Sequence, residues 1–128
     1  MPRKKAVTLT EAELRVMKVV WELGEASVND VLSQLTGTPR PAYNTVLTTM
    51  RILERKGYLQ HLKEGRAFVY RPVVSRQGAQ RRALRHIVNS FFDRSPQSLM
   101  LSLIEDENLT PEDLERLQRM IEEKGRGE

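Results

Sequence analysis

Apolar side chains recur every three or four positions through the first third of the chain, and this spacing predicts helices. The first predicted helix follows Thr10 and ends at Gly24, and Glu13 stands three residues after Thr10, as in a capping box. A shorter helix follows Ser27, and a third is predicted over residues 42–56. The front of the chain is therefore predicted to be mainly helical.

The spacing of apolar residues changes after the third predicted helix. Two short runs of strand-forming residues, 58–62 and 68–70, flank the polar segment 63–66, and this arrangement predicts a β-hairpin. Three helices followed by a hairpin is the element order of a winged helix-turn-helix domain. We expect residues 1–74 to form such a domain, in a protein that is mainly α with a small β-hairpin.

From residue 76 onward the helical spacing returns. Pro96 interrupts it, the very apolar segment 98–104 follows, and Thr110 precedes a last helix. Burying a large apolar side chain stabilises a fold by about 1.5–3 kcal/mol, and so short a segment offers few partners of its own. We therefore expect residues 75–128 to form a helical dimerisation domain, with a monomer that folds this segment back on itself as the alternative. The residues expected in the dimer interface are Leu84, Ile87, Val88, Phe91, Phe92, Leu99, Leu103 and Leu117.

The net charge of +4 is unevenly distributed. Residues 1–74 hold 12 Lys and Arg against 7 Asp and Glu, a balance of +5, whereas residues 75–128 have a balance of −1. A concentrated basic zone suits a polyanion such as nucleic acid, and a basic soluble surface is the alternative. Cysteine is absent, which excludes disulfides and thiolate metal sites, and no apolar run reaches the ~18 residues of a membrane span. We expect a cytoplasmic protein with no membrane insertion, no metal and no cofactor.

The third predicted helix has one apolar and one polar face when residues 42–56 are placed at 3.6 residues per turn. Val46, Met50 and Leu53 share the apolar face, which should pack on the first two helices. On the polar face, Asn44 offers the donor and acceptor pair that matches adenine, near the helix end that meets base edges in helix-turn-helix proteins. The alternative is that this face is only solvated. Threonine is a weak helix former, however, and is a poor choice for a face without another role. The residues predicted to contact double-stranded DNA are Tyr43, Asn44, Thr45, Thr48, Arg51, Arg55 and Lys56, with Lys63 and Arg66 from the hairpin turn.

Several segments together carry a recognisable pattern: residues 9–17 (LTEAELRVM), Trp21, residues 45–53 (TVLTTMRIL), Lys56-Gly57 and residues 68–70 (FVY). Over residues 8–121 the chain resembles the penicillinase-repressor family, which includes β-lactamase, methicillin-resistance and copper-transport repressors. The resemblance implies a winged-helix DNA-binding domain, a helical dimerisation domain, an inverted-repeat operator and repression by blocking transcription. By position, Asn44, Thr45 and Thr48 resemble base-reading residues of the family, whereas Leu47 stands where some relatives have a basic residue.

The same resemblance implies ways in which repression ends. In the β-lactam branch a membrane sensor protease cuts the repressor at an Asn-Phe bond in the dimerisation domain. The matching pair here is Ser102-Leu103, which departs from that pattern. The copper branch carries a C-terminal cysteine motif, which this chain lacks, so copper(I) sensing by that route is not expected.

Other functions remain as alternatives. An enzyme is not expected, because His61 and His86 are the only histidines and the sequence pairs no nucleophile with a base. Thr10, Glu13 and Ser98 are instead explained as helix caps. A regulator that senses a small ligand between helices is a second possibility. A winged helix used for protein–protein contact is a third, but it would not need the exposed polar face of residues 42–56.

Overall fold

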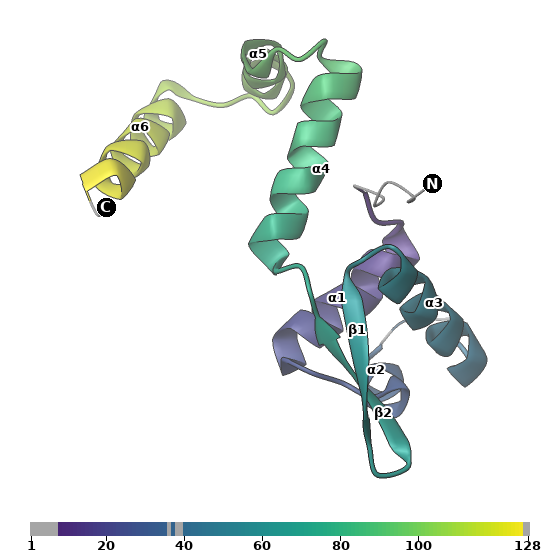
Figure 1. Cartoon of the computed structure of the whole chain (residues 1–128). Helices are drawn as coiled ribbons and strands as arrows, with labels where there is room; N and C mark the ends of the chain where they lie inside the picture. Colours follow the sequence, from purple (N-terminus) through teal and green to yellow (C-terminus); the bar gives the residue numbers. More distant parts are fainter. Residues whose placement is uncertain (1–7, 36, 38–39, 127–128) are drawn as a thin grey trace. The chain divides into compact units, whose positions relative to one another are not determined.

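The computed structural model describes residues 8–35, 37 and 40–126. Within these residues the chain forms six helices and one two-stranded antiparallel sheet (Figure 1). The predicted order of three helices and a hairpin is confirmed, and further helices follow it. In chain order the elements are α1 (Glu11–Leu23), α2 (Val28–Gln34), α3 (Tyr43–Arg55), β1 (Leu59–Glu64), β2 (Ala67–Pro72), α4 (Arg76–Phe91), α5 (Pro96–Asp106) and α6 (Pro111–Arg126).

The chain divides into two compact units, residues 1–86 and residues 87–128. Helix α4 begins in the first unit, where Ala79 is buried, and ends in the second. The predicted domain limit between residues 74 and 75 stays a prediction. None of the described helices combines the length and apolar character needed to cross a membrane.

The first unit has a continuous apolar core. Helices α1, α2 and α3 each contribute a buried apolar face, which for α3 is the face that the helical spacing predicted, and β1 and β2 add residues from the hairpin. Every buried apolar residue among those described lies in this unit, which therefore has the interior that the second unit lacks. The core residues are Val16, Met17, Val20, Ala26, Val28, Val31, Leu35, Val46, Met50, Leu53, Tyr58, Leu59, Tyr70, Val74 and Ala79.

The hairpin is joined to the helices through main-chain hydrogen bonds. Strand β1 pairs with β2 from Leu59 opposite Pro72 to Glu64 opposite Ala67. Between α1 and α2, the Ala26 N–H donates to the Tyr70 carbonyl at 2.9 Å, and the Tyr70 N–H donates to the Ala26 carbonyl at 2.8 Å. This isolated bridge adds a third, one-residue strand to the outer side of β2 and fixes the hairpin beside the helices.

Helix starts follow the cap residues, with one correction. The capping box at Thr10 is confirmed, since its hydroxyl accepts from the Glu13 N–H at 3.2 Å and the Glu13 carboxylate accepts from the Thr10 N–H at 2.9 Å. The cap expected at Ser98 is wrong: the Ser95 hydroxyl accepts from the Ser98 N–H at 3.1 Å, so Ser95 is the N-cap. The physical reason is Pro96, whose fixed φ and missing N–H suit the first position of a helix.

The start of α4 is held on the first unit by two aromatic residues. The Trp21 indole N–H donates to the Val74 carbonyl at 2.9 Å, and the Arg76 guanidinium lies 5.5 Å from the Trp21 ring centroid. Arg82 lies at the same distance from the ring of buried Tyr58. These contacts fix the segment after the hairpin as well as the first turns of α4.

Candidate nucleic-acid interface

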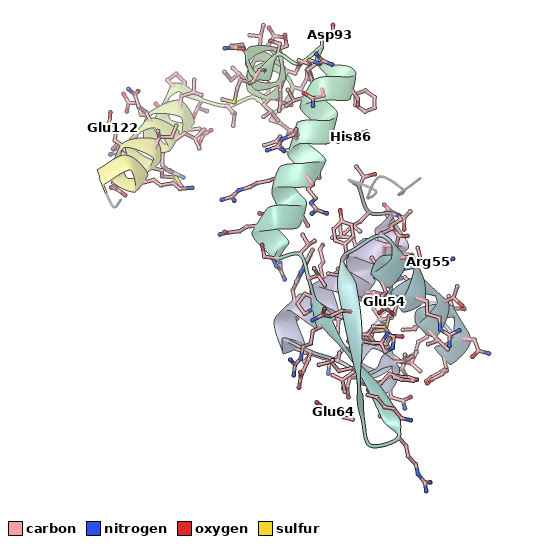
Figure 2. The ribbon with its side chains drawn as sticks, viewed as in Figure 1. Glu54, Arg55, Glu64, His86, Asp93 and Glu122 are labelled. Atoms are coloured by element: carbon pink, nitrogen blue, oxygen red, sulfur yellow. The ribbon has the colours of Figure 1, made fainter. Side chains whose placement is uncertain are left out.

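Helix α3 separates its side chains into a buried face and an exposed face. Val46, Met50 and Leu53 are fully buried, as predicted, and this packing fixes the rotation of the helix. The opposite face is open to solvent, and Arg55 projects outward from it (Figure 2). Six of the predicted contact residues are exposed on α3: Tyr43, Asn44, Thr45, Thr48, Arg51 and Arg55.

The beginning of α3 has no side-chain cap. Ala42 occupies the N-cap position in extended conformation and offers no hydrogen-bonding side chain. The first N–H groups of the helix therefore have no acceptor from the cap residue, and they lie beside Tyr43 and Asn44. An external anion could accept hydrogen bonds from them.

A carboxylate lies among the cations of α3. Thr48, Arg51, Glu54 and Arg55 line a shallow hollow of about 690 Å³ on the exposed face. The imidazole Nδ1 of His61, on β1, lies 2.8 Å from Oε1 and 2.7 Å from Oε2 of Glu54. The sequence analysis did not predict the Glu54–His61 pair. The spacing of three residues between Arg51 and Glu54 indicates only that these two side chains share one side of the helix.

Lys56, the last predicted contact residue of this helix, forms an ion pair with α1. Its ammonium Nζ lies 2.6 Å from Oε1 of Glu13, whose side chain is only 8% exposed. Burial raises the pKa of Glu13, but the hydrogen bonds from Lys56 and Thr10 and the charge of Lys56 together hold that pKa below its usual value. The structure therefore gives Lys56 a partner inside the first unit, and its contact with DNA stays a prediction.

The outer end of the hairpin places two basic side chains in solvent. Lys63 lies on β1 opposite Phe68, and Arg66 follows Gly65 in the turn. Gly65 has a φ of +61°, a left-handed backbone conformation that residues with a Cβ atom rarely adopt. The turn thus depends on Gly65 to present Arg66 at the hairpin tip.

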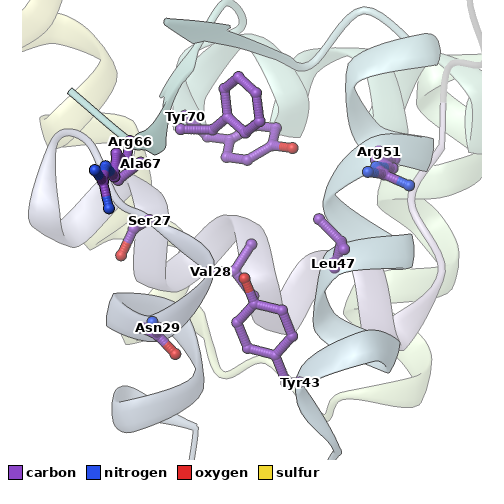
Figure 3. A pocket seen from close by; sticks show the side chains of 10 residues that line it. Ser27, Val28, Asn29, Tyr43, Leu47, Arg51, Arg66, Ala67 and Tyr70 are labelled. Atoms are coloured by element: carbon purple, nitrogen blue, oxygen red, sulfur yellow. The ribbon is translucent and has the colours of Figure 1, made fainter. Parts of the chain in front are cut away.

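A second hollow, of about 420 Å³, lies between α2, α3 and β2 (Figure 3). Arg51 and Arg66 stand on opposite sides of it, and apolar side chains lie between them. Tyr70 borders this cavity, and burial raises the pKa of its phenol, with the nearby Glu54 carboxylate adding to the rise and Arg51 opposing it. The lining residues are Ser27, Val28, Asn29, Tyr43, Leu47, Arg51, Arg66, Ala67, Phe68 and Tyr70.

The sequence of this chain matches one described family along most of its length. A profile of the family described as Penicillinase repressor matches residues 9–123. The chain belongs to the penicillinase-repressor family. Its relatives include the penicillinase repressor of Bacillus licheniformis, which is 32% identical over 120 residues that cover 94% of each chain. The methicillin resistance regulatory protein MecI of Staphylococcus aureus (strain N315) is 23% identical, over 94% of this chain and 98% of its own.

A solved structure from this family supports the fold. The solution structure of the DNA binding domain of the repressor BlaI is 36% identical, with a TM-score of 0.50, and the match covers 61% of this chain and 93% of that one. The likeness confirms the winged-helix fold predicted for the first part of this penicillinase-repressor family member.

Seven of the residues expected in a dimer interface lie on α4, α5 and α6 of this family member, and Phe92 directly follows α4. Leu84, Ile87, Phe91, Leu103 and Leu117 are exposed in the single chain, and Phe91 is the most open of them at 75%. The remaining three, Val88, Phe92 and Leu99, are half-buried. Their place in an interface stays a prediction.

The pair suggested as a cleavage site lies inside a helix. Ser102 is half-buried and Leu103 is exposed, and both belong to α5. A protease binds its substrate in an extended conformation, so a cut between these residues would require α5 to open locally. Cleavage at this bond stays a prediction.

Proposed function

We propose that this chain is a dimeric repressor of transcription that binds an inverted-repeat DNA operator. The observation that carries the proposal is the exposed polar face of α3, which presents Asn44, Thr45 and Thr48 with Arg51 and Arg55 further along the same helix. Family membership supports it, since a relative at 32% identity is a penicillinase repressor and the BlaI structure is that of a DNA binding domain.

Each exposed residue has a role that its chemistry supports. Asn44 can bond both the N6 and N7 edge atoms of adenine, and the methyl groups of Thr45 and Thr48 can contact a thymine methyl. Arg51 and Arg55 suit phosphates, as do the uncapped N–H groups at the start of α3. Tyr43 stands at the edge of this surface, and Lys63 and Arg66 of the hairpin would reach the backbone or the minor groove beside it.

The proposal is tested by finding the bound sequence and then changing the surface that reads it. Genomic fragments are selected with the full chain, and affinity for the enriched operator is measured by fluorescence anisotropy. Asn44→Ala should weaken operator binding about tenfold and relax the preference for one base pair. The matched control Gln60→Ala, which removes an exposed amide on β1, should change affinity less than twofold. Failure to enrich any sequence, or equal losses for both variants, would contradict the proposal.

Dimerisation supplies the second half of the operator contact. The exposed apolar side chains of α4, α5 and α6 would be covered by a second copy, and two recognition helices would then address two half-sites about 34–36 Å apart. We propose that this dimer acts in the cytoplasm and that an inducing signal relieves repression, with a membrane sensor protease that cuts at Ser102-Leu103 as one route.

Salt dependence separates DNA binding from a winged helix that contacts another protein. Displacement of counterions from phosphates makes DNA affinity fall steeply as salt is raised. An affinity for DNA that is unchanged between low and moderate salt would favour the protein-contact alternative.

A further inference from the structure

The cavity between α2, α3 and β2 shares Tyr43, Arg51 and Arg66 with the proposed DNA surface, but its size and its apolar lining also suit a small ligand. Its volume of about 420 Å³ falls within the range of small-molecule sites in proteins. Two of its aromatic side chains, Tyr43 and Phe68, remain 44% and 47% exposed. Half-exposed rings that line a hollow offer flat apolar surface to a ligand, whereas a phosphate gains little from them.

The charges around the cavity select an anion. Arg51 and Arg66 flank the apolar lining (Figure 3). Among the described residues neither forms an ion pair, although the Arg51 side chain also interacts with the phenol of Tyr70. A guanidinium binds a carboxylate through two parallel hydrogen bonds, which favours a planar acid over a neutral or cationic molecule.

We propose that this cavity binds an aromatic carboxylate, and that the bound acid excludes operator DNA from α3. The aromatic part lies against Tyr43, Leu47 and Phe68, and the carboxylate meets Arg51 or Arg66. Tyr43 and Arg51 belong both to the cavity and to the exposed surface of α3, so the two ligands compete for the same side chains. The exclusion of operator DNA by the bound acid rests on the proposed function, whereas binding of the acid in the cavity does not.

Binding of the acid is measured without DNA. 1-Naphthoate is titrated into the ¹⁵N-labelled full chain at constant ionic strength, and backbone amide shifts are followed by NMR. Saturable shifts are expected at residues that line the cavity, such as Val28, Leu47 and Ala67. The neutral analogue 1-naphthalenemethanol should bind about tenfold more weakly, because it lacks the charge-assisted bonds. Equal affinities for the two compounds, or shifts spread over all basic surfaces, would overturn the proposal.

Variants with matched controls locate the site. Phe68→Ala and Arg66→Gln should each weaken 1-naphthoate binding about tenfold. Their controls, Leu62→Ala and Lys63→Gln, remove an exposed apolar group and a charge from the same hairpin outside the cavity, and should change affinity less than twofold. Equal losses in variants and controls would place the acid elsewhere and reject the cavity.

Competition with operator DNA is measured separately. The 1-naphthoate concentration is set at ten times the dissociation constant of the acid, with sodium chloride at matched ionic strength as the control. The apparent operator affinity of the dimer should then fall about a hundredfold, because each of its two copies holds one acid site. Unchanged operator affinity with a filled cavity would reject the exclusion. If the protein binds 1-naphthoate but no DNA, the proposed function is rejected and the cavity site stands. If it binds DNA but no acid, only the cavity site is rejected.

Discussion

Glu13 illustrates how one residue can serve two structural purposes. Its carboxylate accepts from the Thr10 N–H at the start of α1 and from the Lys56 ammonium at the end of α3. A buried carboxylate is costly unless it is paired and hydrogen-bonded, and here both conditions are met. The pair also links residues 43 positions apart, so it helps to orient α3 relative to α1.

Removing the ammonium should therefore destabilise the first unit. We expect Lys56→Met to lower the free energy of unfolding by about 2–3 kcal/mol, because it leaves the Glu13 carboxylate buried without its counter-ion. Urea denaturation at neutral pH measures the change. The control Lys63→Met removes a solvent-exposed ammonium and should alter stability by less than about 0.5 kcal/mol. A Lys56→Met protein as stable as the native chain would show that the ion pair contributes nothing.

The same pair gives the stability of the fold a dependence on acid. Because the pKa of Glu13 lies below its ordinary value of 4.5, its pairing stabilises the folded state above that pH and is lost as the pH falls through the folded pKa. The native chain should lose stability below this range, and Lys56→Met should lose less over the same interval. Parallel pH profiles for the two proteins would contradict this assignment.

At the scale of elements, the sequence predicted what depends on local pattern. The buried face of α3 follows from the spacing of Val46, Met50 and Leu53, and the capping box of α1 follows from two residues. What it missed depends on tertiary contact. Nothing in the spacing of Glu54 indicated a partner on β1, because the partner is set by how the hairpin packs on α3.

The placement of caps and cations shows the same limit. Ser95 and Ser98 are both suitable N-cap residues, and the structure favours Ser95 because Pro96 begins the helix. Lys56 and Arg55 are adjacent basic residues, and the sequence alone did not indicate that only one of them has an acidic partner. The structure pairs Lys56 with a buried acid and leaves Arg55 in solvent.

The hairpin should contribute to DNA affinity through charge alone. We expect Lys63→Gln and Arg66→Gln each to reduce the steepness of log affinity against log salt by about 2, because each removes one phosphate neutralisation from both copies of the dimer. Fluorescence anisotropy over a salt series measures the slope. Lys18→Gln, an exposed change on α1, serves as the control. A slope unchanged in both hairpin variants would remove the hairpin from the proposed interface.

At the scale of the whole molecule, the two units differ in how they bury apolar groups. The first has a closed core, whereas the described residues of the second leave Phe91, Leu101, Met120 and Ile121 mostly exposed. So many exposed apolar side chains in one small unit are typical of a surface that a partner covers. This difference is the physical ground for the proposed dimer.

Phe91→Asp should separate the subunits. A charge placed where apolar contact is expected should yield a monomer by sedimentation and lower operator affinity about a hundredfold or more, since the second half-site is lost. Asn89→Asp adds the same charge to the same helix at a polar position and should leave the dimer intact. A Phe91→Asp protein that still sediments as a dimer would refute this role for Phe91.

The bridge between Ala26 and Tyr70 provides a direct view of how firmly the hairpin is attached. Both amide protons are donated to main-chain carbonyls, and both residues are almost completely buried. They should therefore exchange with deuterated solvent at least about a hundredfold more slowly than the amide of exposed Gly65 at the hairpin tip. Because only opening of the bridge releases the two protons, their exchange rates would report the detachment of the hairpin from the helices in the native protein.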